Sequence, residues 1–249
     1  PEKCLNCFEC VKVCPNYAQK IKDNKHYVDW NLCDLAGECV NVCPSGALKI
    51  IGTNMEVDHI ISEVMKDKKY YDKTGGGITI SGGEPMAQFE FTKELLIEAK
   101  KNGLHTVLDT CGYGEQKHYN QILKYVDLFL FDYKLTDEEL HKDFTGVTNK
   151  EILANLDFLY NNGASIILRC PLIPEINDNE DHLSGIKNII RKYPHLKSVE
   201  IMPYHNMGRD KANRVGMEYK LSHIKNAEES DKQRWINYFI DAEINVVLN

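Results

Sequence analysis

The sequence predicts an α/β protein with a small cysteine-rich domain in front of a larger domain built around a parallel sheet. Two observations carry this prediction. Seven of the nine cysteines lie within residues 4–43, and helix-like and strand-like stretches alternate from Asn54 onward. A chain of 249 residues is long enough for one small and one larger domain, which we expect at residues 1–52 and 53–249.

Composition excludes several classes of function. The net charge is −7 and Lys and Arg are scattered, which argues against a nucleic-acid partner, because phosphates require a basic patch. No apolar run approaches the roughly 20 residues that a bilayer-spanning helix needs. Cysteines crowded at one end of a long chain favour metal ligation over a secreted disulfide framework. That chemistry indicates a reducing, cytoplasmic setting.

The first domain contains an internal repeat of cysteines. The first copy has the spacing Cys-x2-Cys-x2-Cys-x3-Cys-Pro, in which three thiolates hold one iron–sulfur cluster and the fourth reaches the other cluster of a pair. A structural zinc site fits less well, because it usually combines two separated Cys-x2-Cys pairs. We expect one [4Fe–4S] cluster on Cys4, Cys7, Cys10 and Cys43, and a second cluster on Cys14, Cys33 and Cys39.

The second copy of the repeat is imperfect, because Ala36 stands where the repeat requires a cysteine. Three hypotheses follow. The second site holds a three-iron cluster, or it holds a cubane whose last iron is bound by water or by a carboxylate such as Asp34 or Glu38, or it has decayed and is empty. Each copy is followed by a β-prone stretch, at residues 19–22 and 48–51.

The larger domain begins with a helix, since apolar residues recur with helical period from Val57 to Met65. A buried strand at 78–81 and a helix at 89–101, ended by Asn102 and Gly103, come next. Further strands are expected at 105–110, 128–133, 165–170, 198–202 and 245–248. The segments between them are expected to be helical, for example at 152–160 and 183–192, and a last helix is expected at 231–242. Repeated βα units imply a parallel sheet, which is either open or closed into a partial barrel.

A glycine-rich turn follows the first strand of this sheet. Gly82 and Gly83 have no Cβ, so the backbone can approach a ligand closely there, and Glu84 could receive an ammonium group. The turn matches neither a P-loop nor the dinucleotide fingerprint, which disfavours binding of nucleotide phosphates. A tight βα turn without a ligand is the alternative.

Polar residues also gather at the carboxyl ends of the other strands, where parallel βα folds place their ligand sites. Acids, cations and a histidine around one rim suit a small zwitterionic ligand, although His205 alone could be structural. Cys111 and Cys170 are expected to be small core or rim residues. The residues at these ends are Asp109, Thr110, Asp132, Tyr133, Lys134, Arg169 and His205.

The combined motifs resemble the glycyl radical enzyme activating enzymes of the radical SAM superfamily. The resemblance rests on the cysteine repeat and on the segments at 81–85, 108–113, 131–134, 145–149 and 203–208, which read Ser-Gly-Gly-Glu-Pro, Leu-Asp-Thr-Cys-Gly-Tyr, Phe-Asp-Tyr-Lys, Thr-Gly-Val-Thr-Asn and Pro-Tyr-His-Asn-Met-Gly. Pyruvate formate-lyase activating enzyme is a member of this family without the cysteine-rich insert. The resemblance implies a partial (β/α)6 barrel behind a ferredoxin-like domain.

The resemblance also implies an activity and its partners. Such enzymes use a reduced [4Fe–4S] cluster to cleave S-adenosylmethionine (SAM) into methionine and a 5′-deoxyadenosyl radical, which takes a hydrogen atom from a glycine of a partner enzyme. The chemistry is anaerobic, and the electron comes from a donor such as flavodoxin or ferredoxin, through the auxiliary clusters. The runner-up hypothesis is a ferredoxin-like electron carrier fused to a SAM-binding barrel without radical chemistry. A zinc-stabilised binding module is a third.

Residue roles follow from the matched motifs. Gly82, Gly83 and Glu84 would contact the methionyl ammonium of SAM. Asp132, Tyr133, Lys134, Arg169 and His205 would belong to the same pocket, and Asp109, Thr110 and Asp132 to a monovalent-cation site beside the SAM carboxylate.

One departure from the family pattern concerns the cluster that binds SAM. The family carries it on Cys-x3-Cys-x2-Cys after the first barrel strand, and this spacing does not occur here; Cys7, Cys10 and Cys14 have the two intervals in reverse order. The first strand is not recognisable either. Because the chain opens on Pro1 within the insert, we expect an incomplete form that does not cleave SAM by itself.

Overall fold

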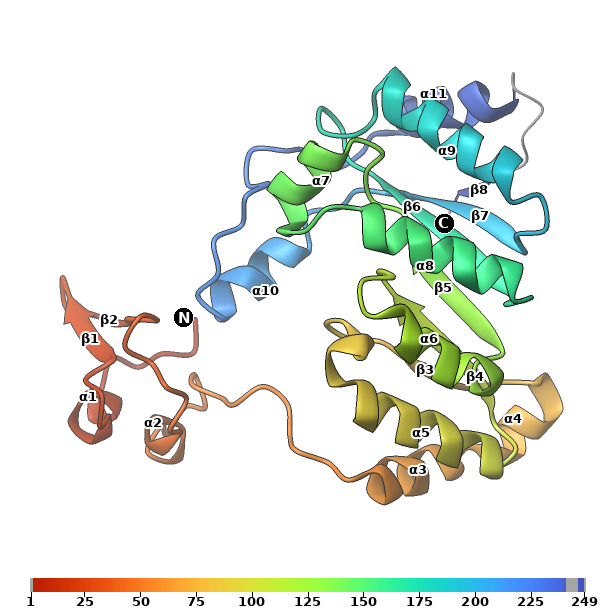
Figure 1. Ribbon diagram of the computed structural model, residues 1–249. Coiled ribbons are helices and arrows are strands. Elements are labelled where there is room, and N and C mark those ends of the chain that lie inside the picture. The colour runs from red at the N-terminus through yellow and green to blue at the C-terminus, as the bar shows by residue number, and fades with distance from the viewer. Residues whose placement is uncertain (1, 241–245, 249) are drawn as a thin grey trace. The chain divides into compact units, whose positions relative to one another are not determined.

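The computed structural model describes residues 2–240 and 246–248 (Figure 1). The chain divides into two compact units. The first combines Pro1–Met55 with Met207–Lys220, and the second combines Glu56–Asn206 with Leu221–Asn249. The segment Met207–Lys220 thus groups with the cysteine-rich unit, whereas the sequence suggested a single boundary between residues 52 and 53.

The first unit has few regular elements, and its two cysteine loops each lead into a short helix. A hairpin follows the first helix, with β1 paired antiparallel to β2 across a turn in which Asp23 and Asn24 have positive φ angles of 51° and 56°. Both residue types tolerate this left-handed backbone, which a two-residue hairpin turn requires. The elements are α1 (Glu9–Val13), β1 (Gln19–Lys22), β2 (Lys25–Val28), α2 (Glu38–Asn41) and α10 (Gly208–Arg214).

The expected β-prone stretch at 19–22 is a strand, but the one at 48–51 is not. The first stretch finds a partner because the turn at Asp23 and Asn24 folds the chain back onto it. The second has no such turn, and Ile50 and Ile51 are 63% and 72% exposed. A single strand without a partner leaves its backbone groups unpaired, so this prediction was wrong.

The second unit is built on a six-stranded sheet in which every neighbouring pair is parallel and the strands follow one another in chain order. Doubly wound open sheets reverse their strand order, whereas barrels do not, so the arrangement is that of a partial barrel. The strands are β3 (Gly77–Ile80), β4 (His105–Thr110), β5 (Leu128–Asp132), β6 (Ile166–Leu172), β7 (Ser198–Pro203) and β8 (Val247–Leu248).

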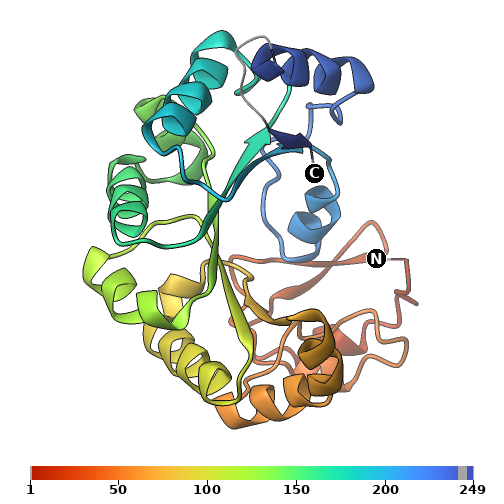
Figure 2. The same cartoon turned by 90° about the vertical axis from the view of Figure 1, so that its right-hand side faces the viewer.

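Helices alternate with these strands, and Figure 2 shows α5, α6, α8 and α9 on one outer side of the curved sheet. The sequence predicted α3, α5, α8, α9 and α11 with their approximate bounds and helical segments between the strands, where α6 and α7 lie, but it did not predict α4. The residues expected at 241–242 and 245 lie outside the described part. The helices are α3 (Val57–Met65), α4 (Lys68–Thr74), α5 (Phe89–Lys101), α6 (Gln116–Ile122), α7 (Glu138–Thr145), α8 (Lys150–Asn161), α9 (Glu180–Lys192) and α11 (Glu229–Ile240).

The core of the second unit lies between the sheet and these helices. Along β4, β5 and β6 buried residues alternate with partly exposed ones, because successive side chains of a strand point to opposite faces. Leu108, Phe129 and Leu168 are fully buried on the helix-covered face. The other face of these strands carries Asp109, Asp132 and Arg169, all partly exposed. None of the helices in the described part has the length and apolar character needed to cross a membrane.

A buried histidine supports the chain just beyond β5. His182 of α9 is 3% exposed, and its Nδ1 accepts a hydrogen bond of 3.1 Å from the backbone N–H of Thr136. The ring proton therefore lies on Nε2, which has no hydrogen-bond partner among the described residues. Burial lowers the pKa of His182 from 6.5 to about 4. The neutral ring is thus part of the folded structure.

We predict a specific pH dependence from this ring. The pKa in the folded protein is below that of the unfolded chain, so the stabilisation is complete above pH 6.5 and is lost as the pH falls towards 4. Between pH 7 and pH 5 the loss is about 2 kcal/mol. Chemical denaturation at both values should show a smaller pH effect for His182→Gln than for the wild type. An equal pH effect in the two proteins would contradict the assignment.

Candidate functional site

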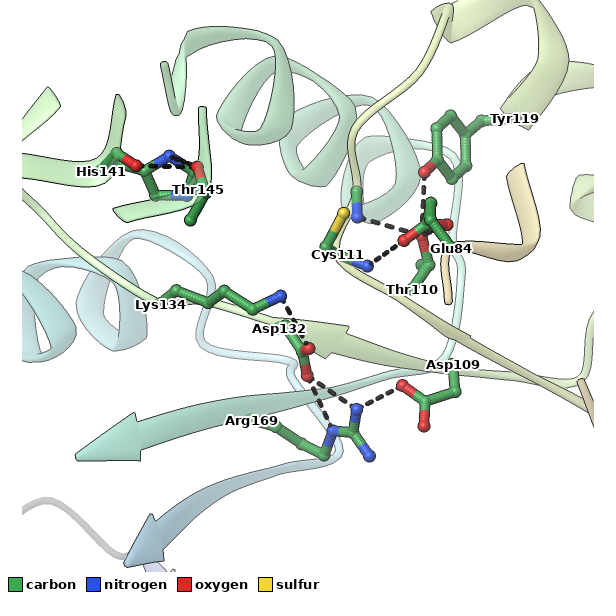
Figure 3. Close-up of polar contacts among 11 residues, drawn as sticks. Glu84, Asp109, Thr110, Cys111, Tyr119, Asp132, Lys134, His141, Thr145 and Arg169 are labelled. Carbon is green, nitrogen blue, oxygen red and sulfur yellow. Dashed lines mark hydrogen bonds and ion pairs between the residues drawn. The ribbon is translucent and has the colours of Figure 1, made fainter. Parts of the chain in front are cut away.

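The carboxyl ends of β4, β5 and β6 bring three charged residues together. In-register pairing puts Asp132 directly opposite Arg169, with Asp109 on the next strand. The Arg169 guanidinium donates to Asp132 Oδ1 through Nε at 3.0 Å and Nη2 at 2.7 Å, and Nη2 also contacts Asp109 Oδ1 (Figure 3). Lys134 Nζ lies 3.2 Å from the other oxygen of Asp132. The strand pairing thus builds a network of two acids and two cations.

The charges of this network are only partly hydrated. The side chains of Arg169, Asp132 and Asp109 are 15%, 21% and 23% exposed. Burial, with the nearby charges of Asp132 and Glu84, raises the pKa of Asp109 even though Arg169 favours its ionised form. An ion pair of this kind is sensitive to removal of one partner, because the other charge is then left poorly solvated.

Glu84 is fixed by the end of β4. Its Oε1 accepts from Thr110 Oγ1 at 2.7 Å and from the Met86 N–H at 3.2 Å, and its Oε2 accepts from the Cys111 N–H at 2.8 Å. Figure 3 shows this carboxylate held between the hydroxyl and the backbone. Each oxygen can accept more than one bond, so Glu84 keeps acceptor capacity for a ligand. Its orientation is set before any ligand arrives.

A cavity of about 220 Å³ opens between Glu84 and the ion-pair network. Gly82 has a φ of +126°, which favours glycine, and a Cβ on Gly82 or Gly83 would meet no atom within 4 Å, so both backbones face open space. The wall includes seven of the ten residues that the sequence predicted for the ligand site. The cavity is lined by Gly82, Gly83, Glu84, Asp109, Cys111, Asp132, Lys134 and Arg169.

Three predicted residues do not line it. Thr110 is 2% exposed and lies behind Glu84 as its hydrogen-bond donor. Tyr133 is 3% exposed, and its hydroxyl donates to Thr136 Oγ1 at 2.9 Å on the face opposite Asp132 and Lys134, as strand alternation requires. His205 follows β7 and is exposed. A direct role of these three in ligand binding stays a prediction.

A second cavity of about 280 Å³ shares Glu84, Cys111, Asp132 and Lys134 with the first. Sequence analysis did not predict its other residues. His141 of α7 is 2% exposed. Its Nδ1 donates to the carbonyl of Val147 at 2.7 Å, which holds the segment after α7 against this helix. The segment 145–149, which contributes Thr145 and Val147 to the wall, is the sequence signal that points to it. The additional lining residues are Tyr113, His141, Thr145, Val147 and Ile152.

The loop after β4, which contributes Cys111 to both cavities and Tyr113 to the second, is held by a buried amide side chain. Asn155 of α8 is buried, and its Nδ2 donates to the carbonyl oxygens of Gly112 at 2.8 Å and Gly114 at 2.7 Å. Gly112 has a φ of +77°, and a Cβ there would lie 2.1 Å from Cζ of Phe131. The chain can therefore pass over this ring only with glycine at position 112.

The two isolated cysteines are not activated nucleophiles. Burial, with Glu84 as a neighbour, raises the pKa of Cys111 to about 11, so its thiol stays protonated at neutral pH. Cys170 is fully buried in the core, and burial also raises its pKa. Their placement as a cavity-wall residue and a core residue agrees with the sequence-based expectation.

The seven N-terminal cysteines are free thiols that fall into groups. Burial raises the pKa of Cys10, and the charges of Cys4 and Cys7 add to this effect. Burial likewise raises the pKa of Cys39, with added effects of Cys14 and Cys33. The charge interactions therefore join Cys4, Cys7 and Cys10 in one group and Cys14, Cys33 and Cys39 in another.

The fourth cysteine of each copy has a hydrogen-bond partner close by in the chain, a backbone N–H for Cys14 and a side-chain hydroxyl for Cys43. Ala18 N–H donates to Cys14 Sγ at 3.2 Å, and Ser45 Oγ lies 3.7 Å from Cys43 Sγ. In the described part no three metal-binding side chains are close enough to hold a single ion. Cluster irons each take one thiolate at separate corners, so thiolates around a [4Fe–4S] cluster stand farther apart than those around one ion. The groups fit the expected ligand sets, except that nothing described ties Cys43 to the first group.

Comparison with known proteins identifies relatives of both units. The model of the radical SAM superfamily matches residues 41–184, and that of the 4Fe-4S dicluster domain matches residues 3–49. The trans-4-hydroxy-L-proline dehydratase activating enzyme of Clostridioides difficile is 36% identical over 92% of this chain and 76% of its own length. The pyruvate formate-lyase-activating enzyme of Clostridium pasteurianum is 32% identical over 75% of this chain and 78% of its own length.

A solved structure shares the fold. The crystal structure of a domain of pyruvate-formate lyase-activating enzyme from Bacteroides vulgatus superposes with a TM-score of 0.59 at 23% identity, over 70% of this chain and 99% of that domain.

We predict that Arg169→Leu costs about 2–4 kcal/mol at pH 7, because two poorly hydrated carboxylates lose their shared cation. Burial raises the pKa of Asp109 and Arg169 opposes this effect, so without the guanidinium the pKa of Asp109 should rise further. The loss of stability should therefore shrink as the pH falls and Asp109 becomes protonated. Denaturant unfolding of both proteins from pH 7 to pH 4.5 measures this. A loss that stays constant with pH would contradict the role given to Arg169.

Proposed function

Because this chain belongs to the radical SAM superfamily, and within it to the glycyl radical enzyme activating enzymes, we propose that it works with a partner glycyl radical enzyme and uses SAM as the source of the radical. The bound SAM and a reduced [4Fe–4S] cluster supply the radical chemistry. The residues of this chain supply the binding site for SAM and the ligands of the auxiliary clusters.

The charge of the cavity supports SAM as its ligand. Its wall carries three carboxylates, Glu84, Asp109 and Asp132, and the two cations Lys134 and Arg169. Three acids against two bases leave a net charge of about −1 when all are ionised. SAM carries a sulfonium, an ammonium and a carboxylate, which sum to one positive charge. Wall and ligand are therefore complementary in net charge and in the presence of both signs.

The arrangement supports separate tasks for the two ends of the cavity. Glu84 presents spare acceptor capacity next to the open backbone of Gly82 and Gly83, which suits an ammonium donor. Lys134 carries a flexible ammonium that could turn from Asp132 to a ligand carboxylate. Arg169 keeps Asp109 and Asp132 in place. A monovalent cation between these two acids would have to compete with the guanidinium that pairs with both of them.

The first unit is proposed to carry electrons. Its two cysteine groups would hold auxiliary clusters that accept an electron from a donor such as flavodoxin or ferredoxin. Thiolate ligands of this kind persist in a reducing compartment, which supports a cytoplasmic location. The Cys-x3-Cys-x2-Cys spacing of the SAM-binding cluster does not occur in the 249 residues. We therefore assign the ligands of that cluster to no residue of this chain.

We predict that Glu84→Gln and Lys134→Ala each weaken SAM binding by about tenfold or more, since each removes a hydrogen bond to a charged group. The binding should be measured by equilibrium dialysis with anaerobically reconstituted protein. The iron content should not change, because neither residue belongs to the cysteine unit. Lys73→Ala, an exposed change on α4, is the matched control and should bind SAM normally. Equal affinities in all four proteins would contradict the assignment of the cavity.

The radical activity has its own test. If the reading frame upstream of Pro1 encodes a Cys-x3-Cys-x2-Cys segment, the complete polypeptide, reduced under anaerobic conditions with SAM, is expected to release 5′-deoxyadenosine. Failure to form this product under strong reduction would contradict the radical function. It would favour the alternative of a ferredoxin-like electron carrier fused to a SAM-binding barrel.

A further inference from the structure

The second cysteine loop keeps the backbone of the first. Asn6 and Leu35, at equivalent positions of the repeat, have φ angles of 51° and 65°. Two residues later Phe8 and Gly37 are again left-handed, at 60° and 93°, and helices begin at the next residue in both copies. Residue 36 thus occupies the same place in its loop as Cys7 does in the first loop. The second loop differs in the ligand and not in the fold.

This conformation is unfavourable for Leu35. A residue with a Cβ rarely adopts a positive φ, and Leu35 is 74% exposed, so packing does not hold it there. A loop that had lost its cluster would have no need of this backbone. The retained geometry therefore argues against a decayed, empty site.

The second loop still brings three thiols together. Cys14 caps the end of α1, α1 packs against α2, which carries Cys39, and Cys33 lies in the loop that leads into α2. In the first group Cys7 completes the close triplet, but the methyl group of Ala36 cannot bind iron. A cubane on the second group would therefore have one iron without a thiolate.

A side chain with a possible oxygen ligand lies beside Ala36, the position that lacks a thiolate. Asp34 Oδ1 accepts a hydrogen bond of 3.1 Å from the N–H of Ala36, so this carboxylate lies beside the residue that replaces the fourth thiolate. The equivalent residue of the first copy is Leu5, which has no such group. Asp34 is thus specific to the copy that lacks a cysteine.

We propose that the second auxiliary cluster is a cubane held by only three thiolates, those of Cys14, Cys33 and Cys39, and that its fourth iron faces Ala36 and has an exchangeable oxygen ligand, supplied by Asp34 or by water. The proposal depends on the ligand sets of the cysteine unit and not on SAM binding. It can therefore fail while the proposed function stands.

The iron without a thiolate should be easier to remove than the other irons of the cluster. Oxygen ligands hold an iron of a sulfide cluster less firmly than thiolates do. A one-electron oxidant such as ferricyanide should convert [4Fe–4S]²⁺ into [3Fe–4S]⁺, with release of one Fe²⁺ and transfer of one electron to the oxidant. The first cluster, with its full set of thiolates, should keep its iron under the same treatment.

The test compares the full chain with Ala36→Cys, both reconstituted anaerobically. The wild type should bind about eight irons per chain and, after mild ferricyanide treatment, lose about one iron and show the electron paramagnetic resonance signal of [3Fe–4S]⁺. Ala36→Cys should keep its iron and show at most a small fraction of that signal. Wild-type protein with only about four irons, or a signal of equal size in both proteins, would overturn the proposal.

A second measurement needs no variant, in case Ala36→Cys does not assemble. Oxidised wild-type protein that is then reduced with ⁵⁷Fe²⁺ should take up about one iron and lose the signal, and Mössbauer spectra should show the label in a single corner. Label spread over both clusters, or no uptake, would overturn the proposal.

Asp34→Asn distinguishes the two sources of oxygen, with Glu38→Gln as the matched control. If Asp34 binds the iron, Asp34→Asn should lose it at least several-fold faster than wild type; if water binds it, the rate should not change. Either result supports an oxygen ligand. Faster loss in Glu38→Gln and not in Asp34→Asn would overturn the placement of Asp34 at the corner.

Discussion

The parallel register between β4, β5 and β6 is the constraint on which the site depends. It places Asp132 opposite Arg169 and puts Asp109 on the same face one strand away. The side-chain period of a strand is two residues, so a slip of one residue would turn these groups into the core and bring Phe131 or Cys170 to the cavity. Burial of the large apolar residues on the helix side therefore fixes the charged face as well.

The cavity is organised before a ligand enters. Glu84 is held by a buried hydroxyl and by backbone donors, and the two aspartates share one guanidinium, so their positions do not depend on binding. Pre-ordered groups spare a ligand the entropic cost of arranging them. Lys134 is the exception, because its flexible ammonium contacts Asp132 at 3.2 Å and can exchange this contact for another. The site thus combines a fixed wall with one adaptable cation.

Much of this arrangement could be predicted from the sequence, because it depends on local signals. Apolar period, turn glycines and strand ends indicated the parallel sheet and seven of the residues around the cavity. Tyr133 lies on the face opposite Asp132 and does not line the cavity, because successive residues along the strand alternate between faces and adjacency in sequence hides this alternation. Thr110 acts through Glu84, and no local pattern reveals such an indirect contact. His141 and Val147 reach the second cavity through a fold of the chain after β5, which depends on tertiary packing.

In the cysteine unit the sequence predicted the groups of ligands but not the local backbone structure. Spacing alone suggested which thiols gather, and charge interactions within the structure support the same two groups. The failed strand at 48–51 shows that a β-prone composition needs a partner, and only the first copy has the turn that provides one. The shared left-handed positions of the two loops could not be read from the sequence, because Asn6 and Leu35 have different side chains and different preferences for that backbone.

The loop that crosses the Phe131 ring contains positions that the fold constrains and positions that it leaves free to vary. Position 112 admits only glycine, and Asn155 ties down the carbonyl groups on both sides of Tyr113. The side chains at 111 and 113 line the cavities but do not take part in that fastening. Substitution at positions 111 and 113 would therefore change the shape of the two cavities and leave the backbone of this loop in place.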